Sequence, residues 1–214
     1  IGPIPTYICA MEQFVVSARK YRPQAFEAVV GQSHITDTLL KSVENDHLAQ
    51  ALLFCGPRGV GKTTCARILS KVINGGADLT DEELALNIFE LDAASNNSVD
   101  DIRRLIDQVR FAPQTGKFKV YIIDEVHMLS QQAFNAFLKT LEEPPAHAIF
   151  ILATTEKHKI IPTILSRCQI FDFKRITVDD IAAHLAFVAQ KEGVTAEPEA
   201  LHMIAEKADG ALRD

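Results

Sequence analysis

Residues 52–63 read Leu52-Leu53-Phe54-Cys55-Gly56-Pro57-Arg58-Gly59-Val60-Gly61-Lys62-Thr63, a short apolar run followed by the pattern G-x-x-x-x-G-K-T. Apolar residues at helical spacing come next, so the stretch has the strand–loop–helix order of a phosphate-binding loop. Glycines let the backbone curl until its N–H groups face phosphate oxygens, and the following helix adds the positive end of its dipole. We therefore expect the chain to bind a nucleoside triphosphate.

The loop offers the side chains that a triphosphate and its cation need. Lys62 can reach the β- and γ-phosphates, and the hydroxyl of Thr63 can hold Mg²⁺. The expected nucleotide-binding residues of this stretch are Gly56, Pro57, Arg58, Gly59, Val60, Gly61, Lys62, Thr63 and Thr64.

The composition is ordinary for a soluble globular protein, since 47% of the 214 residues are hydrophobic and 23% are charged. The net charge of −6 argues against a surface that grips DNA by bulk electrostatics alone. Apolar runs stay well short of the roughly 20 residues that span a bilayer, and no secretory signal pattern is found. We therefore expect a cytoplasmic protein without a membrane partner.

The four cysteines, Cys9, Cys55, Cys65 and Cys168, are scattered along the chain and form no C-x-x-C pair. This spacing indicates reduced, mostly buried thiols rather than a disulfide framework or a structural zinc site. We expect no zinc in this chain.

Apolar runs alternate with helical patterns. The runs predict strands at 51–55, 88–91, 119–123, 149–153 and 169–173. The helical patterns lie around 35–43, 65–73, 78–86, 98–109, 130–141, 178–191 and 198–208, and 18–23 is expected to be a basic extended segment. This alternation favours an α/β fold, a five-stranded, mostly parallel sheet with helices on both faces.

The last two helices lie beyond the final strand and predict the start of a small helical domain. We therefore expect a nucleotide-binding domain at 11–174 and a truncated helical domain at 175–214. Residues 1–10 have the character of tag or vector sequence.

The third strand ends in two carboxylates, Asp124 and Glu125, at the sheet edge where α/β proteins bind ligands. Asp124 can orient Mg²⁺ and its water shell, and Glu125 is placed to activate an attacking water. The alternative is a pair of solvated charges at a strand end, which is the weaker interpretation downstream of a phosphate-binding loop.

Hydroxyl and guanidinium groups complete the candidate site. Thr155 follows the fourth strand, where a hydroxyl can contact the γ-phosphate or the attacking water. Arg167 lies just before the fifth strand, and Arg213 lies at the start of a last helical pattern. Single arginines are usually surface charges, but phosphoryl transfer recurrently uses one to stabilise its transition state.

Five of these motifs together resemble the AAA+ ATPases of the clamp-loader group, whose signature is the Ser-Arg-Cys triplet. They are the phosphate-binding loop, Ile122-Ile123-Asp124-Glu125-Val126-His127, Ala153-Thr154-Thr155, Ser166-Arg167-Cys168 and Gly210-Ala211-Leu212-Arg213-Asp214. Three further stretches are similar to the gamma/tau subunit family of bacterial DNA polymerase III: Ala18-Arg19-Lys20-Tyr21-Arg22-Pro23, Leu91-Asp92-Ala93-Ala94-Ser95 and Leu138-Lys139-Thr140-Leu141-Glu142-Glu143-Pro144-Pro145. The resemblance runs from about Phe14 to Asp214.

The resemblance implies an AAA+ P-loop fold with a lid domain, ATP and Mg²⁺ as cofactors, and a role for each matching residue. Lys62, Thr63 and Asp124 would bind ATP–Mg²⁺, and Glu125 would be the catalytic base. Thr155 and Arg213 would sense the nucleotide of their own subunit, while Arg167 would reach a neighbour's ATP. Val30 and Gly31 would lie beside the adenine.

The same resemblance implies a replication function in the bacterial cytoplasm, as part of the DNA-directed DNA polymerase III holoenzyme. ATP binding would let a ring of such subunits open the sliding clamp, and hydrolysis on primed DNA would release the closed clamp. The implied partners are other clamp-loader subunits, the clamp and primed DNA. The collar domain needed for stable oligomers is missing, so a monomer is possible for this chain.

One departure concerns zinc. The family usually carries four zinc-binding cysteines between the helix after the loop and the second strand, but residues 74–87 contain no cysteine. Whether that module was deleted or never present is open, and the expectation of no zinc stands.

Two alternatives remain open. A Holliday-junction branch-migration motor shares the phosphate-binding loop and the Asp-Glu pair, although the Ser-Arg-Cys triplet and residues 141–145 count against it. A non-hydrolysing stator subunit would keep the fold, but it need not retain Lys62, Asp124 and Glu125.

Overall fold

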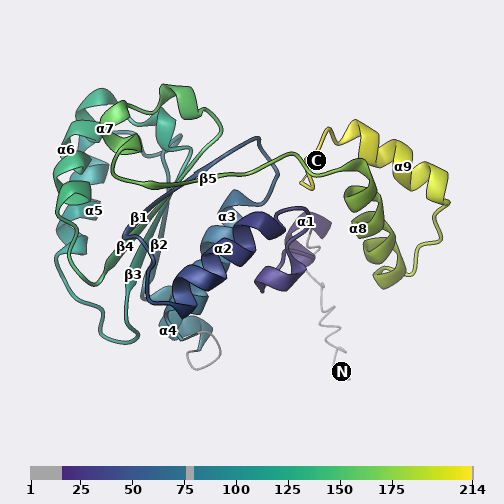
Figure 1. Cartoon of the computed structure of the whole chain (residues 1–214), viewed down its shortest axis with the longest axis horizontal. Coiled ribbons are helices and arrows are strands. Elements are labelled where there is room, and N and C mark those ends of the chain that lie inside the picture. The colour runs from purple at the N-terminus through teal and green to yellow at the C-terminus, as the bar shows by residue number, and fades with distance from the viewer. Residues whose placement is uncertain (1–15, 76–79, 214) are drawn as a thin grey trace, which may run out of the picture.

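The computed structural model of the chain describes residues 16–75 and 80–213. The segment expected to be tag sequence, residues 1–10, lies outside them. Within the described residues, five strands form one sheet in the order β2-β3-β4-β1-β5, and all neighbours run parallel (Figure 1). The strands are β1 (Ala51–Cys55), β2 (Ile88–Asp92), β3 (Lys119–Asp124), β4 (Ala148–Thr154) and β5 (Gln169–Asp172). The predicted α/β fold is confirmed.

Helices precede the first strand, connect successive strands and continue along the chain after the last strand. The α-helices are α1 (Ser17–Lys20), α2 (Ser33–Glu44), α3 (Lys62–Ile73), α4 (Asp81–Ala85), α5 (Val99–Val109), α6 (Gln131–Glu142), α7 (Pro162–Leu165), α8 (Val178–Lys191) and α9 (Pro198–Lys207). Short 3₁₀ turns are η1 (Phe26–Ala28), η3 (Val126–Met128) and η4 (Lys157–Lys159).

Both faces of the sheet are buried, which explains the uninterrupted apolar runs of its central strands. On one face, Leu52 and Phe54 of β1 pack in a cluster with residues of α2 and α3. On the other face, Leu53 packs in a second cluster with residues of α5 and α6. Every residue of β1 and β4 is buried. The sheet therefore holds the ends of these strands rigidly.

Side-chain caps fix where several helices begin. The hydroxyl of Ser98 accepts a hydrogen bond from the Asp101 N–H, and the hydroxyl of Ser130 accepts one from the Ala133 N–H. Each cap satisfies a backbone donor that the first helical turn leaves free. Both predicted helix starts are confirmed.

Three expectations need correction. The segment 18–23 is not extended throughout, because the Tyr21 N–H bonds to the Ser17 carbonyl oxygen and closes α1. The acidic helix expected at 78–86 is the five-residue α4, and its predicted start lies outside the described residues. Residues 211–213 are not helical; the N–H of Leu212 bonds instead to the Gly59 carbonyl oxygen at 3.0 Å.

Beyond β5, helices α8 and α9 pack together in a small unit that lies to one side of the sheet (Figure 1). Its core consists of Ile176, Ile181, Ala182 and Ala205. The N-terminal segment reaches across to this unit, because Nζ of Lys20 and the hydroxyl of Tyr21 both contact Oε1 of Glu192, at 2.7 and 2.8 Å.

Candidate active site

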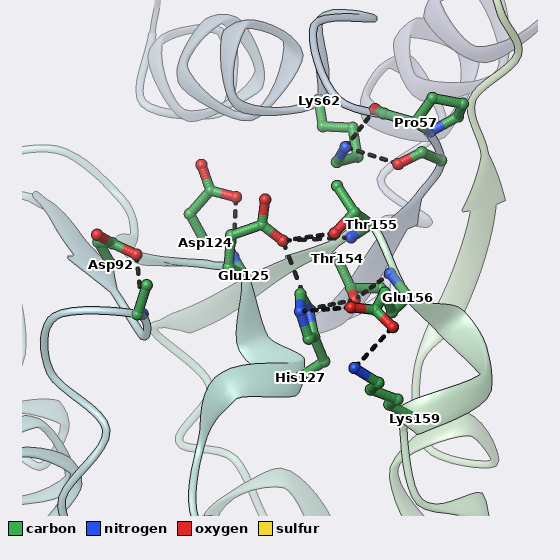
Figure 2. A network of polar contacts seen from close by, with 12 residues as sticks. Pro57, Lys62, Asp92, Asp124, Glu125, His127, Thr154, Thr155, Glu156 and Lys159 are labelled. Carbon is green, nitrogen blue, oxygen red and sulfur yellow. Dashed lines mark hydrogen bonds and ion pairs between the residues drawn. The ribbon is translucent and has the colours of Figure 1, made fainter.

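The phosphate-binding loop leads from the end of β1 into α3, as its sequence predicts. Gly61 has a φ of 101° and forms the N-cap of α3. Lys62 is only 6% exposed, and its Nζ donates to the carbonyl oxygens of Gly56 at 2.7 Å and Pro57 at 2.6 Å (Figure 2). Burial lowers the pKa of the Lys62 ammonium, and the carboxylates of Glu125 and Asp124 oppose that shift. The loop therefore holds one buried cation that faces two carboxylates.

Two positions in this loop have no room for a side chain. A Cβ on Gly56, where φ is 149°, would lie 2.5 Å from the carbonyl oxygen of Phe173. A Cβ on Gly59, where φ is 75°, would lie 2.7 Å from Cβ of Ala211. Glycine is required here because the segment after β5 and the segment after α9 both press against the loop.

The two residues expected to hold Mg²⁺ meet directly. The hydroxyl of Thr63, in the first turn of α3, donates to Oδ2 of Asp124 at 2.7 Å. The other carboxylate oxygen, Oδ1, accepts from the backbone N–H of Glu125 at 2.9 Å (Figure 2). A hydroxyl and a carboxylate at the mouth of the loop are oxygen ligands of the kind that Mg²⁺ binds.

Glu125 adopts a backbone conformation that is unusual for a residue with a side chain, with φ 47° and ψ 43°. Such strain is typical of functional positions. Its Oε2 accepts a hydrogen bond from the Thr155 hydroxyl at 2.9 Å and a longer one from the Thr155 N–H at 3.4 Å. The two sequence-predicted residues are therefore partners, and Thr155 contacts the expected base.

A cavity of about 710 Å³ opens beside the loop. It lies between the phosphate-binding loop, the N-terminal segment and the two-helix unit. Of the predicted site residues, those lining it are Val30, Arg58, Gly59, Val60, Gly61, Lys62, Thr63, Thr64, Asp124, Glu125 and Arg213. Gly31, Gly56, Pro57, Thr155 and Arg167 do not line it. The cavity is also lined by residues that the sequence analysis did not assign to the site, among them Tyr21, Arg22, His184 and Leu185.

Arg22 is a basic residue that lines this cavity. It is named in the sequence analysis within residues 18–23, but no role is predicted for it there. Burial lowers the pKa of its guanidinium, and the nearby charges of Arg67 and Arg213 act in the same direction. The cavity lining therefore brings together four basic side chains, those of Arg22, Arg58, Lys62 and Arg213, which suits an anionic ligand.

Gln32 was also missed, although it links three parts of the site. This fully buried side chain donates from Nε2 to the Lys174 carbonyl oxygen at 2.7 Å and to that of Val60 at 3.4 Å. It thereby ties the start of α2 to the loop and to the segment after β5. A lone glutamine after a glycine gives no sequence signal of this role.

Arg167 lies apart from the cavity, after α7. Its NH1 donates to the Thr163 carbonyl oxygen at 2.6 Å, and its NH2 pairs with Oε1 of Glu142 at 2.6 Å. The side chain keeps 32% of its surface exposed. It therefore does not reach the cavity of its own chain.

Within residues 16–75 and 80–213, no group of three or more His, Cys, Asp or Glu side chains is placed to hold a metal ion. Cys55 and Cys65 are buried and Cys168 is half-buried, all with free thiols. Burial raises the pKa of Cys55 to about 11 and of Cys65 and Cys168 to about 12. Cys9 lies outside the described residues, so the absence of zinc stays a prediction. None of the described helices has the length and apolar character to cross a membrane.

Comparisons with known proteins agree with this geometry. The family model described as "DNA polymerase III, delta subunit" matches residues 31–177, and that described as "DNA polymerase III clamp loader subunit, ATPase lid domain" matches 180–214. DNA polymerase III subunit tau of Bacillus subtilis is 52% identical, over 92% of this chain and 37% of that protein. Subunit tau of Escherichia coli is 45% identical, over 94% of this chain and 33% of that protein. The chain spans only about a third of the length of these relatives.

Among solved structures, the Holliday junction branch migration motor RuvB of Thermotoga maritima superposes with a TM-score of 0.70. It is 23% identical, over 90% of this chain and 62% of that chain. At this identity the likeness shows the shared AAA+ fold alone. Because the two family models cover both the sheet domain and the two-helix unit, the chain belongs to the DNA polymerase III clamp-loader ATPase family.

Proposed function

We propose that this chain is the ATP-binding and ATP-hydrolysing part of a gamma/tau subunit of the bacterial replicative clamp loader. It uses ATP to open the sliding clamp and to load it on primed DNA. The observation that carries the proposal is the meeting of Thr63, Asp124 and Glu125 at the mouth of the loop that holds Lys62. Binding a triphosphate needs the loop, and hydrolysing it needs the carboxylates as well.

Each predicted residue has a role in this proposal. The loop residues 56–64 bind the phosphates through their N–H groups and Lys62. Thr63 and Asp124 hold Mg²⁺, which neutralises charge on the β- and γ-phosphates when bound. Glu125 takes the proton of the attacking water, and Thr155, hydrogen-bonded to it, contacts the γ-phosphate region. Val30 lines the wall where we place the adenine, with Gly31 behind it.

Two arginines act on two different nucleotides. Arg213 lines the cavity of its own chain and serves the ATP bound there. Arg167 is exposed and lies outside that cavity, which favours a role at a neighbouring subunit's ATP. An arginine supplied from a neighbour couples hydrolysis to assembly, because each complete site then needs two chains.

The proposed partners are other clamp-loader subunits, the sliding clamp and primed DNA, all in the bacterial cytoplasm. We divide the chain into a nucleotide-binding domain at 11–174 and a lid domain at 175–214. The lid forms part of the cavity wall, because the Leu212 N–H bonds to the Gly59 carbonyl oxygen and because α8 supplies part of the lining.

Two other functions compete with this one. A branch-migration motor shares the fold, but the relatives that match most of this chain at 45–52% identity are tau subunits. A non-hydrolysing stator needs neither the Thr63–Asp124 contact nor a Glu125 aligned by Thr155.

An ATPase assay on the full-length subunit, assembled with its partner subunits, tests the proposal. We expect turnover that the clamp and primed DNA together stimulate. A motor of the branch-migration type would respond instead to a four-way DNA junction. A stator would show no turnover under any of these conditions.

A further inference from the structure

His127 lies two residues after Glu125, in η3, and its side chain is only 6% exposed. Its Nδ1 lies 3.0 Å from the hydroxyl oxygen of Thr154 and 3.4 Å from Oε2 of Glu125 (Figure 2). On the opposite side of the ring, Nε2 lies 3.4 Å from Oε1 of Glu156. A single buried imidazole thus stands between the expected catalytic base and a second carboxylate.

The orientation of this ring is set by groups that lie outside the cavity. Thr154 is fully buried at the end of β4, and its hydroxyl oxygen also accepts the N–H of Glu156 at 3.0 Å. Glu156 is itself held by a 2.7 Å ion pair with Lys159. A buried polar ring with a partner at each nitrogen has one favourable orientation, because turning it would leave polar groups unpaired.

The Glu125 carboxylate, unlike the ring of His127, needs neighbouring groups to fix its orientation. It stands on a strained backbone and on a side chain with three torsions, yet a general base must point at its water within hydrogen-bond reach. Thr155 fixes Oε2 from one direction, and Nδ1 of His127 approaches the same oxygen from another. Contacts from these two residues to Oε2 limit the rotation of the carboxylate and leave Oε1 for the reaction.

We propose that His127 is a positioning residue for Glu125. With Thr155, it holds the carboxylate in the direction that hydrolysis requires, while Thr154 and Glu156 hold the ring. The inference rests on the proposed function, because it assigns Glu125 the role of base. It adds a residue that acts through Glu125 and touches neither nucleotide nor metal.

The two ring nitrogens can be tested separately. The side-chain amide of asparagine occupies the region of Nδ1, whereas that of glutamine occupies the region of Nε2. In full-length protein within the assembled clamp loader, His127→Asn should therefore retain most of kcat. His127→Gln and His127→Ala should lower kcat by up to about 100-fold, since small misplacements of a catalytic group have effects of that size. KM for ATP and nucleotide affinity should stay within about twofold of the native values.

A double substitution separates positioning from general damage. If His127 acts through Glu125, then His127→Ala should cost nothing further in a Glu125→Gln background, because groups that work as a unit are not additive. His158→Asn is the matched control, since His158 lies 3.6 Å from Oε2 of the same Glu156 but is 77% exposed. It should leave kcat, KM and Tm unchanged.

The outcomes are distinct. Equal losses in His127→Asn and His127→Gln, additive losses in the double variant, or losses that appear only in KM or Tm would each overturn the positioning role. Failure of the proposed function looks different, because native protein would then lack turnover or Glu125→Gln would retain it.

Discussion

The hydroxyl of Thr155 donates a 2.9 Å hydrogen bond to Oε2 of Glu125, joining the ends of β4 and β3. These residues follow strands that are neighbours in the sheet. The expected base and the expected sensor of the γ-phosphate are thus one hydrogen-bonded unit, so a change at the nucleotide can reach the base directly.

Glu125→Gln should bind ATP–Mg²⁺ nearly normally and hydrolyse it about 10²–10⁴-fold more slowly. Glutamine keeps the shape of the side chain and an oxygen for Thr155, but it cannot accept a proton from water. Nucleotide affinity and turnover measured on the same preparation decide the matter. Loss of both together would mean that Glu125 serves binding only.

Lys62→Ala should abolish tight ATP binding. Its ammonium is buried inside the loop, and removing it takes away the charge that faces the β- and γ-phosphates. Calorimetric titration with ATP measures the loss. An unchanged dissociation constant would contradict the assignment of this loop. Lys71→Ala, a lysine in the last turn of the same helix, is the control.

Arg167→Ala should be nearly inactive in the assembled complex, because an arginine supplied by a neighbour can be worth about 10³–10⁵-fold in turnover. Lys62→Ala should be nearly inactive as well. Mixing the two variants should restore part of the activity, since an Arg167→Ala subunit keeps its loop and a Lys62→Ala neighbour keeps its arginine. One interface of the mixed oligomer then contains a complete site.

That mixing experiment needs full-length chains that include the collar, and mass spectrometry should verify that mixed oligomers form. If Arg167 served its own subunit, no mixture could rebuild a site. Flat activity in a verified mixed oligomer would therefore rule out the assignment to a neighbour.

Metal analysis of the purified chain should find no stoichiometric zinc. Structural zinc takes four nitrogen or sulfur ligands, and Cys55, Cys65 and Cys168 belong to no such group in the described residues. Inductively coupled plasma measurement against protein concentration gives the ratio. One zinc per chain would show that Cys9, or another residue outside residues 16–75 and 80–213, completes a zinc site.

Gly56→Ala should destabilise the fold by about 1–3 kcal/mol, because the new methyl group would overlap the Phe173 carbonyl oxygen. Gly193→Ala is the matched control. Its φ is +68°, but nothing lies within 4 Å of the added Cβ, so only backbone strain is introduced. Chemical denaturation should show the larger loss for Gly56→Ala. Equal losses in the free energy of unfolding would show that the loop shifts enough to accommodate the methyl group.

The sequence predicted the strands and the loop because each rests on local chemistry. A short apolar run between turn signals favours a buried strand, as in β1, and Ser98 and Ser130 cap their helices through the turn that follows each of them. Most of the predicted site residues share this dependence on local sequence, since they stand at strand ends or in the loop.

The rest of the site depends on contacts between distant segments. Gln32 meets Lys174 only after all five strands have been made. The contacts of His127 come from Thr154 at the end of β4 and from Glu156 just after it. The short helix α1 is four residues long, below the length at which periodicity can be read. The role of Arg167 depends on a second chain, which no single sequence describes.

Strand β1, which carries the phosphate-binding loop, lies between β4 and β5, both of which come much later in the chain. On the ribosome, this strand leaves the exit tunnel long before either of its neighbours exists. The Gly59 carbonyl oxygen of the loop gains its hydrogen-bond donor later still, when Leu212 has been added. The nucleotide pocket is therefore among the last parts of residues 16–213 to be completed during synthesis, because its loop needs partners that are made after it. A nucleotide that binds only the completed pocket would stabilise this part of the chain only after Leu212 is in place.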